Sequence, residues 1–187
     1  MAQNLFLFVA IKLKKQRRKV RMADTFSQED RFEALSQKIN ATLDISKNCA
    51  QTSYSVLDQE FDLEGGKILK ALTPFPGIAL RGETCGAVIG CLMAIGLVYG
   101  RDDLSDWKGY LSSLPPSRRF CRRFEEEHGS TACAALLEIN LGRTYDLANR
   151  VEALKYAVAG GKKTCGRIIT SAVYMAAEII MKRNEPN

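Results

Sequence analysis

Residues 84–99 read TCGAVIGCLMAIGLVY and are the most hydrophobic segment of this 187-residue chain. Gly86, Gly90 and Ala94 are spaced four residues apart, so they line one face of a helix. Glycine destabilises a helix by roughly 0.5–1 kcal/mol relative to alanine, so two glycines inside one helix indicate that a close approach matters there. Either another helix packs tightly on this stripe, or the stripe makes room for a bulky group.

Helical patterns continue on both sides of this segment. We expect further helices over residues 27–39, 47–61, 103–114, 117–128, 131–139, 146–157 and 164–182. Gly65-Gly66 should end the second helix, residues 73–84 should form an irregular loop, and Pro115-Pro116 should separate two helices. No strand alternation is present. The sequence therefore predicts an all-α protein, a single compact helical domain of about six to eight helices with no sheet.

Four cysteines share one sequence context, because each follows a short polar or glycine segment at the predicted start of a helix. They are Cys49, Cys85, Cys133 and Cys165. A helix N-terminus presents free N–H groups and about half a positive charge, which favours thiolate over thiol and should lower the cysteine pKa. The pattern indicates a thiolate site, either a metal or cluster ligand set or a redox pair. The alternative is that these cysteines are small core hydrophobes.

Several kinds of site are excluded by the sequence. There is no Cys-x-x-Cys motif for thioredoxin-like redox chemistry or a zinc ribbon, and no Walker loop or dinucleotide-binding fingerprint. His128 is the single histidine, so a multi-histidine metal site within one chain is impossible. Its context, three glutamates before it and Gly129 after it, is that of a surface helix C-terminus, which favours a structural role.

The other two cysteines have different settings. Cys91 lies six residues after Cys85, on another face of the same helix, and is interpreted as core. Cys121 lies among four arginines at 118, 119, 122 and 123, which could lower its pKa. The simpler interpretation is a solvated helix face whose arginines pair with the glutamates at 125–127.

The basic charge of the chain belongs to its first residues. Residues 1–21 hold seven lysines and arginines and no acid, and the remainder carries 20 basic and 21 acidic residues. A nucleic-acid function would rest on this segment alone, so none is predicted. We interpret residues 1–21 as a basic N-terminal extension, either disordered or assigned by an incorrect start with Met22 as the true one. A weak membrane-surface anchor is the alternative, because residues 5–13 are apolar. Residues 22–187 would then form the helical four-cysteine domain.

No segment is long and apolar enough to predict a transmembrane span, and the order of the first residues is not that of a secretory signal. We therefore expect a cytoplasmic protein. Thiols stay reduced in that compartment, so the six cysteines are expected to be ligands, redox thiols or core residues and not structural disulfides.

The segments around these cysteines resemble the C_GCAxxG_C_C family of redox-active proteins. Cys85-Gly86-Ala87-x-x-Gly90 matches the family signature, and the likeness extends over about residues 40–177. The resemblance implies that the family's four cysteines are Cys49, Cys85, Cys133 and Cys165. It further implies redox activity and iron–sulfur binding, as in the related region of split-Soret cytochromes. Neither Cys91 nor Cys121 matches a family cysteine.

Three functions fit these residues. The first is electron transfer through an iron–sulfur cluster bound by the four cysteines. The second is a thiol–disulfide oxidoreductase that uses a pair, Cys49 with Cys85. The third is a structural zinc module on the same four thiolates. The expected partner is an unidentified redox protein, and a homo-oligomer in which two chains share the ligands stays open.

Overall fold

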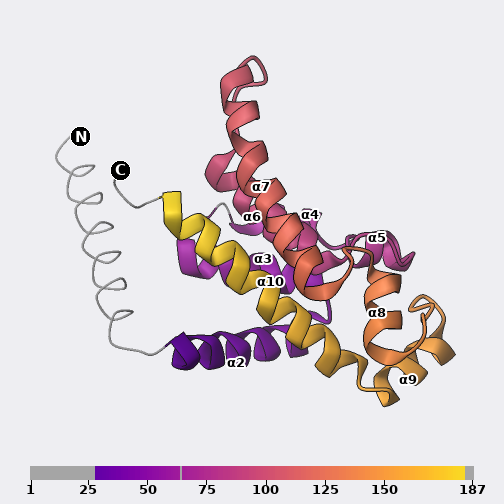
Figure 1. Cartoon of the computed structure of the whole chain (residues 1–187). Coiled ribbons are helices and arrows are strands. Elements are labelled where there is room, and N and C mark those ends of the chain that lie inside the picture. The colour runs from indigo at the N-terminus through magenta and orange to yellow at the C-terminus, as the bar shows by residue number, and fades with distance from the viewer. Residues whose placement is uncertain (1–27, 64, 184–187) are drawn as a thin grey trace. The chain divides into compact units, whose positions relative to one another are not determined.

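The computed structural model describes residues 28–63 and 65–183, and within these ranges it contains nine helices and no strand. The all-α prediction is confirmed. The helices are α2 (Gln28–Ser46), α3 (Cys49–Phe61), α4 (Gly65–Ala71), α5 (Gly77–Leu80), α6 (Gly86–Tyr99), α7 (Trp107–His128), α8 (Cys133–Leu141), α9 (Arg150–Val158) and α10 (Gly161–Arg183), labelled in Figure 1.

The chain divides into two compact units, Met1–Leu35 and Ser36–Asn187. Of the first unit only the beginning of α2 is described, and the predicted extension over residues 1–21 lies outside the described residues. The second unit carries all six cysteines, so any thiol chemistry of the chain belongs to it.

Helices α3, α6 and α10 form the core of the second unit, each packed on the other two, with α7 against α6 and α10. In Figure 1, α10 crosses in front of α3, which it contacts. The glycine stripe of α6 lies on α3: a Cβ added at Gly90 would be 2.3 Å from the carbonyl oxygen of Ala50. Of the two interpretations of this stripe, helix packing accounts for Gly90.

The predicted break at Pro115-Pro116 is wrong, since α7 continues through both prolines. Proline removes the N–H that would bond to the carbonyl four residues earlier. Those carbonyls belong to Leu111 and Ser112, which are exposed, so water can satisfy them. The helix therefore does not need to break at the two prolines, because the carbonyls that lose their partners lie at the surface.

The segment between α3 and α6 is more ordered than predicted. Asp62, in the left-handed conformation, ends α3, and Gly65 begins the unpredicted helix α4. Residues 77–80 form a left-handed turn, with φ of 53° at Gly77 and 49–63° at the next three residues. Such a run costs roughly 1–2 kcal/mol per non-glycine residue, so the surrounding contacts must hold it.

Contrary to the expectation from the sequence, one helix of the described residues, α10, is long and apolar enough to cross a membrane. However, 67% of its apolar window is buried inside the protein. Its buried residues include Ile168, Ile169, Ala172, Val173, Ala176, Ile179 and Ile180. The same composition is expected of the central helix of a helical core.

Candidate functional site

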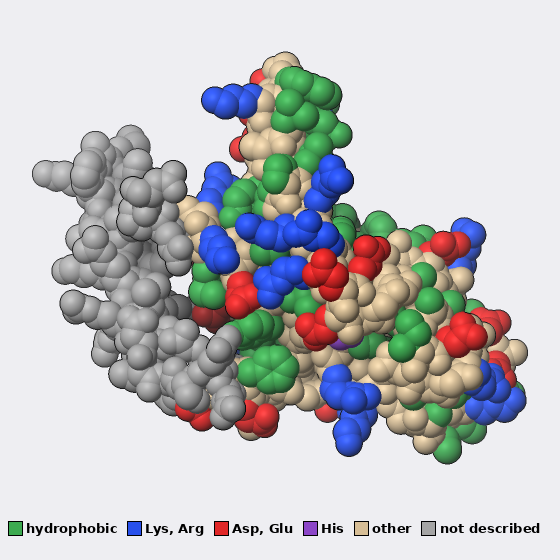
Figure 2. Space-filling view, in the orientation of Figure 1, with side chains coloured by type: hydrophobic (Ala, Val, Ile, Leu, Met, Phe, Trp, Pro, Cys, Tyr) green, Lys and Arg blue, Asp and Glu red, His purple; other side chains and the backbone are tan. Residues whose placement is uncertain are grey.

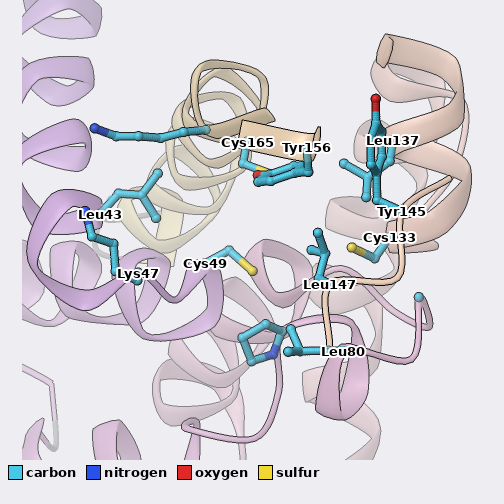
Figure 3. A pocket seen from close by; sticks show the side chains of 13 residues that line it. Leu43, Lys47, Cys49, Leu80, Cys133, Leu137, Tyr145, Leu147, Tyr156 and Cys165 are labelled. Carbon is cyan, nitrogen blue, oxygen red and sulfur yellow. The ribbon is translucent and has the colours of Figure 1, made fainter. Parts of the chain in front are cut away.

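The four predicted site cysteines come together at one end of the core. Cys49, Cys133 and Cys165 line a single cavity of about 240 Å³. Figure 3 shows these three side chains around it, each supplied by a different part of the chain. Cys85 is 7% exposed, and its thiol is hydrogen-bonded to that of Cys49. All six thiols of the chain are free.

Asn48 fixes the first of these cysteines. Its side-chain oxygen accepts a hydrogen bond from the N–H of Gln51 at 3.0 Å, which caps α3 so that Cys49 is the first helical residue. The Asn48 amide also donates to the carbonyl of Thr73 at 3.0 Å. A buried asparagine thus ties the start of α3 to the segment that leads into α5.

A short backbone bridge brings the next two cysteines together. Thr84 and Ala132 form an isolated antiparallel bridge. The N–H of Cys85 donates to Thr131 at 2.8 Å, and the N–H of Cys133 donates to Glu83 at 2.6 Å. Each cysteine directly follows its bridge residue, so the starts of α6 and α8 are held side by side.

Two glycines make room for the sulfurs. A Cβ at Gly86 would lie 2.4 Å from the sulfur of Cys49, so that position requires glycine. A Cβ at Gly77 would lie 3.3 Å from the Cβ of Cys133, and Gly77 has a φ of 53°. The second interpretation of the α6 stripe, room for a bulky group, therefore applies at Gly86, where that group is a thiol.

Cys165 differs from the prediction. Helix α10 begins at Gly161, so Cys165 lies in its second turn and not at a helix start. Its sulfur accepts a hydrogen bond from the hydroxyl of Tyr156 at 3.0 Å. The pKa of Tyr156 is raised mainly by burial and further by the nearby Cys165 thiol, so the phenol stays protonated.

The predicted lowering of the cysteine pKa values is wrong for three of the four thiols. Burial raises the pKa of Cys133 to about 12 and that of Cys165 to about 11, and neighbouring thiols add to the first shift. The hydrogen bond with Cys49 and burial raise the pKa of Cys85 well above its ordinary value. Backbone N–H groups of α6 oppose this shift but are the smaller effect, so desolvation exceeds the helix dipole here.

The cavity walls are mainly aliphatic and aromatic. Its lining residues besides the cysteines are Leu43, Lys47, Pro76, Leu80, Gly82, Leu137, Tyr145, Leu147, Tyr156 and Lys162. The Lys47 ammonium lies 3.6 Å from the carboxylate of Asp44, and Lys162 pairs with the same carboxylate. Both ammonium groups are thus paired with one carboxylate.

Cys91 and Cys121 lie outside this site, as predicted. Cys91 is fully buried in α6, and burial raises its pKa. Burial and Glu125 raise the pKa of Cys121 as well, so the neighbouring arginines do not activate it. Figure 2 shows the basic and acidic side chains mixed over α7, and Arg122 pairs with Glu126 at 3.5 Å.

His128 has the structural role predicted for it but is less exposed than expected. Its ring packs on Phe124 with centroids 4.5 Å apart, and Nε2 is hydrogen-bonded to Ser171 at 3.0 Å. Burial lowers its pKa. Ser171 in turn donates to Glu127, so the acid bonds to the serine and not to the histidine's second nitrogen, unlike a catalytic triad.

Sequence reasoning missed Tyr156 and the bridge between Thr84 and Ala132. A single tyrosine in an amphipathic segment has no sequence pattern that marks it as a site residue. A bridge of one residue pair is too short to show the alternation of a strand. Among the described residues, no group of three or more His, Cys, Asp or Glu side chains is arranged to hold a single metal ion. Cys49, Cys133 and Cys165 instead line a cavity of about 240 Å³, which has room for more than one ion.

One family model matches the chain. It is described as "Putative redox-active protein (C_GCAxxG_C_C)", and the match covers residues 47–179, which include all four site cysteines. No curated protein and no solved structure matches the chain.

Proposed function

Because the chain belongs to the C_GCAxxG_C_C family of redox-active proteins, we propose that its four gathered cysteines ligate an iron–sulfur cluster and that the protein transfers electrons. The observation that carries the proposal is the cavity of about 240 Å³ with Cys49, Cys133 and Cys165 in its wall and Cys85 beside it. Four cysteines are the usual ligand set of such clusters.

The chemistry of the site supports a cluster. The walls are mainly apolar, and the glycine at 86 leaves space at the Cys49 sulfur. A bound cluster would supply a one-electron couple. The cysteines would hold it, and the mainly apolar walls would limit the access of water. Three of the thiols are protonated in the metal-free protein because their pKa values are raised, so loading must release protons.

Location and partner rest on the same chemistry. The proposed chemistry needs reduced thiols, which persist in a reducing compartment, so the proposal includes a cytoplasmic location. An electron-transfer protein needs a redox partner protein, and the proposal includes one without naming it.

The test is anaerobic purification followed by iron and sulfide analysis. We expect iron and sulfide in the wild-type protein and in the Cys91→Ala and Cys121→Ser controls. Single serine variants of Cys49, Cys85, Cys133 and Cys165 should each lose most of the iron. A colourless, iron-free protein after reconstitution would contradict the proposal, and one zinc per chain without iron would support a structural zinc module instead.

A second function is favoured by the contact between the Cys49 and Cys85 thiols. In thiol–disulfide exchange, the Cys49 thiolate would attack a disulfide of the partner and release one partner thiolate. Cys85 would then displace the second, leaving a Cys49–Cys85 disulfide and a reduced partner. Mild oxidation followed by peptide mass spectrometry should find this disulfide if that function holds, and random or absent pairing would exclude it.

A further inference from the structure

We propose that Tyr156 sets the reduction potential of this site by donating a hydrogen bond to the sulfur of Cys165. The inference rests on the redox function proposed above and assigns a positioning role to a residue outside the cysteine set.

The contact itself is short and has a defined direction. The Tyr156 hydroxyl lies 3.0 Å from the sulfur of Cys165, and a phenol is the donor toward sulfur. Tyr156 belongs to α9 and Cys165 to α10, so the bond closes one corner of the cavity. Figure 3 shows the tyrosine ring lying alongside Cys165 and facing the space that Cys49 and Cys133 also border.

The position of the ring is fixed by its neighbours. A Cβ at Gly161 would lie 2.0 Å from a ring carbon of Tyr156, so the ring rests directly on the glycine at the start of α10. The ring also meets Tyr145 edge to face, with centroids 5.9 Å apart. The guanidinium of Arg143 covers Tyr145 at 4.5 Å and pairs with Glu152 of α9. The hydroxyl is therefore aimed at the sulfur by packing on two sides.

The effect on the redox couple depends on charge. One added electron increases the negative charge on the ligand sulfurs, and a donor aimed at one of them stabilises that state more than the oxidised one. The bond should therefore raise the reduction potential.

The test compares Tyr156→Phe with Tyr145→Phe. Both variants remove one hydroxyl from a tyrosine that lines the cavity, but only Tyr156 bonds to a site sulfur. In the loaded protein, we expect Tyr156→Phe to shift the equilibrium about tenfold toward the oxidised form, equal to a fall of about 59 mV for one electron. Tyr145→Phe should leave the potential unchanged.

A third variant keeps the phenol and moves it. Gly161→Ala places a methyl group in the space of the Tyr156 ring, so it should lower the potential in the same direction with the hydroxyl intact. If Tyr156→Phe does not fold, Gly161→Ala tests the same hydrogen bond in its place. In the metal-free wild-type protein, NMR should find a slowly exchanging Tyr156 hydroxyl proton close to the Cys165 β-protons.

The outcomes separate this inference from the function on which it rests. A loaded Tyr156→Phe protein with the wild-type potential, or equal shifts in both phenylalanine variants, overturns the role of Tyr156 and leaves the cluster proposal standing. A Tyr156 hydroxyl proton that exchanges freely overturns it as well. A wild-type protein without any redox-active group overturns both.

Discussion

Gly90 of α6 lies against the main chain of α3 at Ala50, so close that a Cβ would be 2.3 Å from the Ala50 carbonyl oxygen. The same Cβ would lie 3.0 Å from the Cβ of Ser53 and 3.1 Å from the N of Tyr54. Three contacts with one helix leave no direction in which a methyl group could move. The distance between α3 and α6, and hence between Cys49 and Cys85 at their starts, depends on this glycine.

The first prediction concerns stability at this contact. Gly90→Ala should destabilise the metal-free protein by about 1–3 kcal/mol, because the methyl group forces the two helices apart. Gly96→Ala is the matched control in the same helix: it has nothing within 4 Å of the added Cβ. It should stabilise by about 0.5–1 kcal/mol through helix propensity. Urea denaturation measures both changes, and equal effects would contradict the packing argument.

The second prediction concerns the site itself. Gly86→Ala puts a Cβ 2.4 Å from the Cys49 sulfur, so that thiol must turn away from Cys85. We expect less iron per folded chain under the cluster function, or a lower yield of the Cys49–Cys85 disulfide under the exchange function. Gly96→Ala again provides the control, since it should match the wild type in both assays. Full loading of Gly86→Ala would show that the sulfur contact is dispensable.

The third prediction concerns alkaline pH. Burial raises the pKa of Cys133 to about 12 from an ordinary value of 9.0, and that of Cys165 to about 11. The folded state therefore binds more protons than the unfolded state above pH 9, and stability must fall as the pH rises. The metal-free protein should lose stability between pH 9 and 12.

Comparison with a variant isolates the cysteine contribution from that of lysines and tyrosines, which titrate in the same range. Denaturation of Cys133→Ala, measured at intervals from pH 8 upward, should show a smaller loss than the wild type. Parallel curves for the two proteins would mean that the Cys133 thiol does not contribute.

The fourth prediction compares two ion pairs of α7. Arg123 pairs with Glu178 of α10 at 2.7 Å and is partly buried, whereas Arg122 pairs with Glu126 of its own helix at 3.5 Å and is 74% exposed. Arg123→Ala should cost about 1 kcal/mol, and Arg122→Ala less than about 0.5 kcal/mol. Thermal denaturation at low and moderate salt provides the comparison, and a larger effect at Arg122 would contradict it.

Much of the helical architecture could be predicted from the chain alone, because residue periodicity and caps are local. Helix α6 begins at Gly86 and ends at Tyr99, close to the predicted 84–99, and α3 lies within the predicted 47–61. The prediction of a break at Pro115-Pro116 was wrong, because an exposed stretch of helix tolerates the loss of backbone hydrogen bonds to its carbonyl groups. Residues 77–80 could not be predicted, because left-handed leucine, alanine and isoleucine depend on tertiary contacts.

The identity of the candidate site residues was predictable, and their electrostatics were not. Cys49 and Cys133 are first residues of their helices and Cys85 is an N-cap, as their contexts indicate. The pKa values depend on burial and on thiol neighbours, which a sequence does not provide. The Tyr156 bond is likewise tertiary, since it needs the turn between α9 and α10 to place the hydroxyl on Cys165.

The bridge between Thr84 and Ala132 joins segments that the ribosome releases far apart in time. The start of α6 must wait for the start of α8, and the Cys165 corner is completed only when α10 has emerged. A scaffold or insertion factor that delivers a cofactor would thus meet an incomplete binding site throughout most of translation. If the proposed cluster is bound, its loading should therefore be a post-translational event.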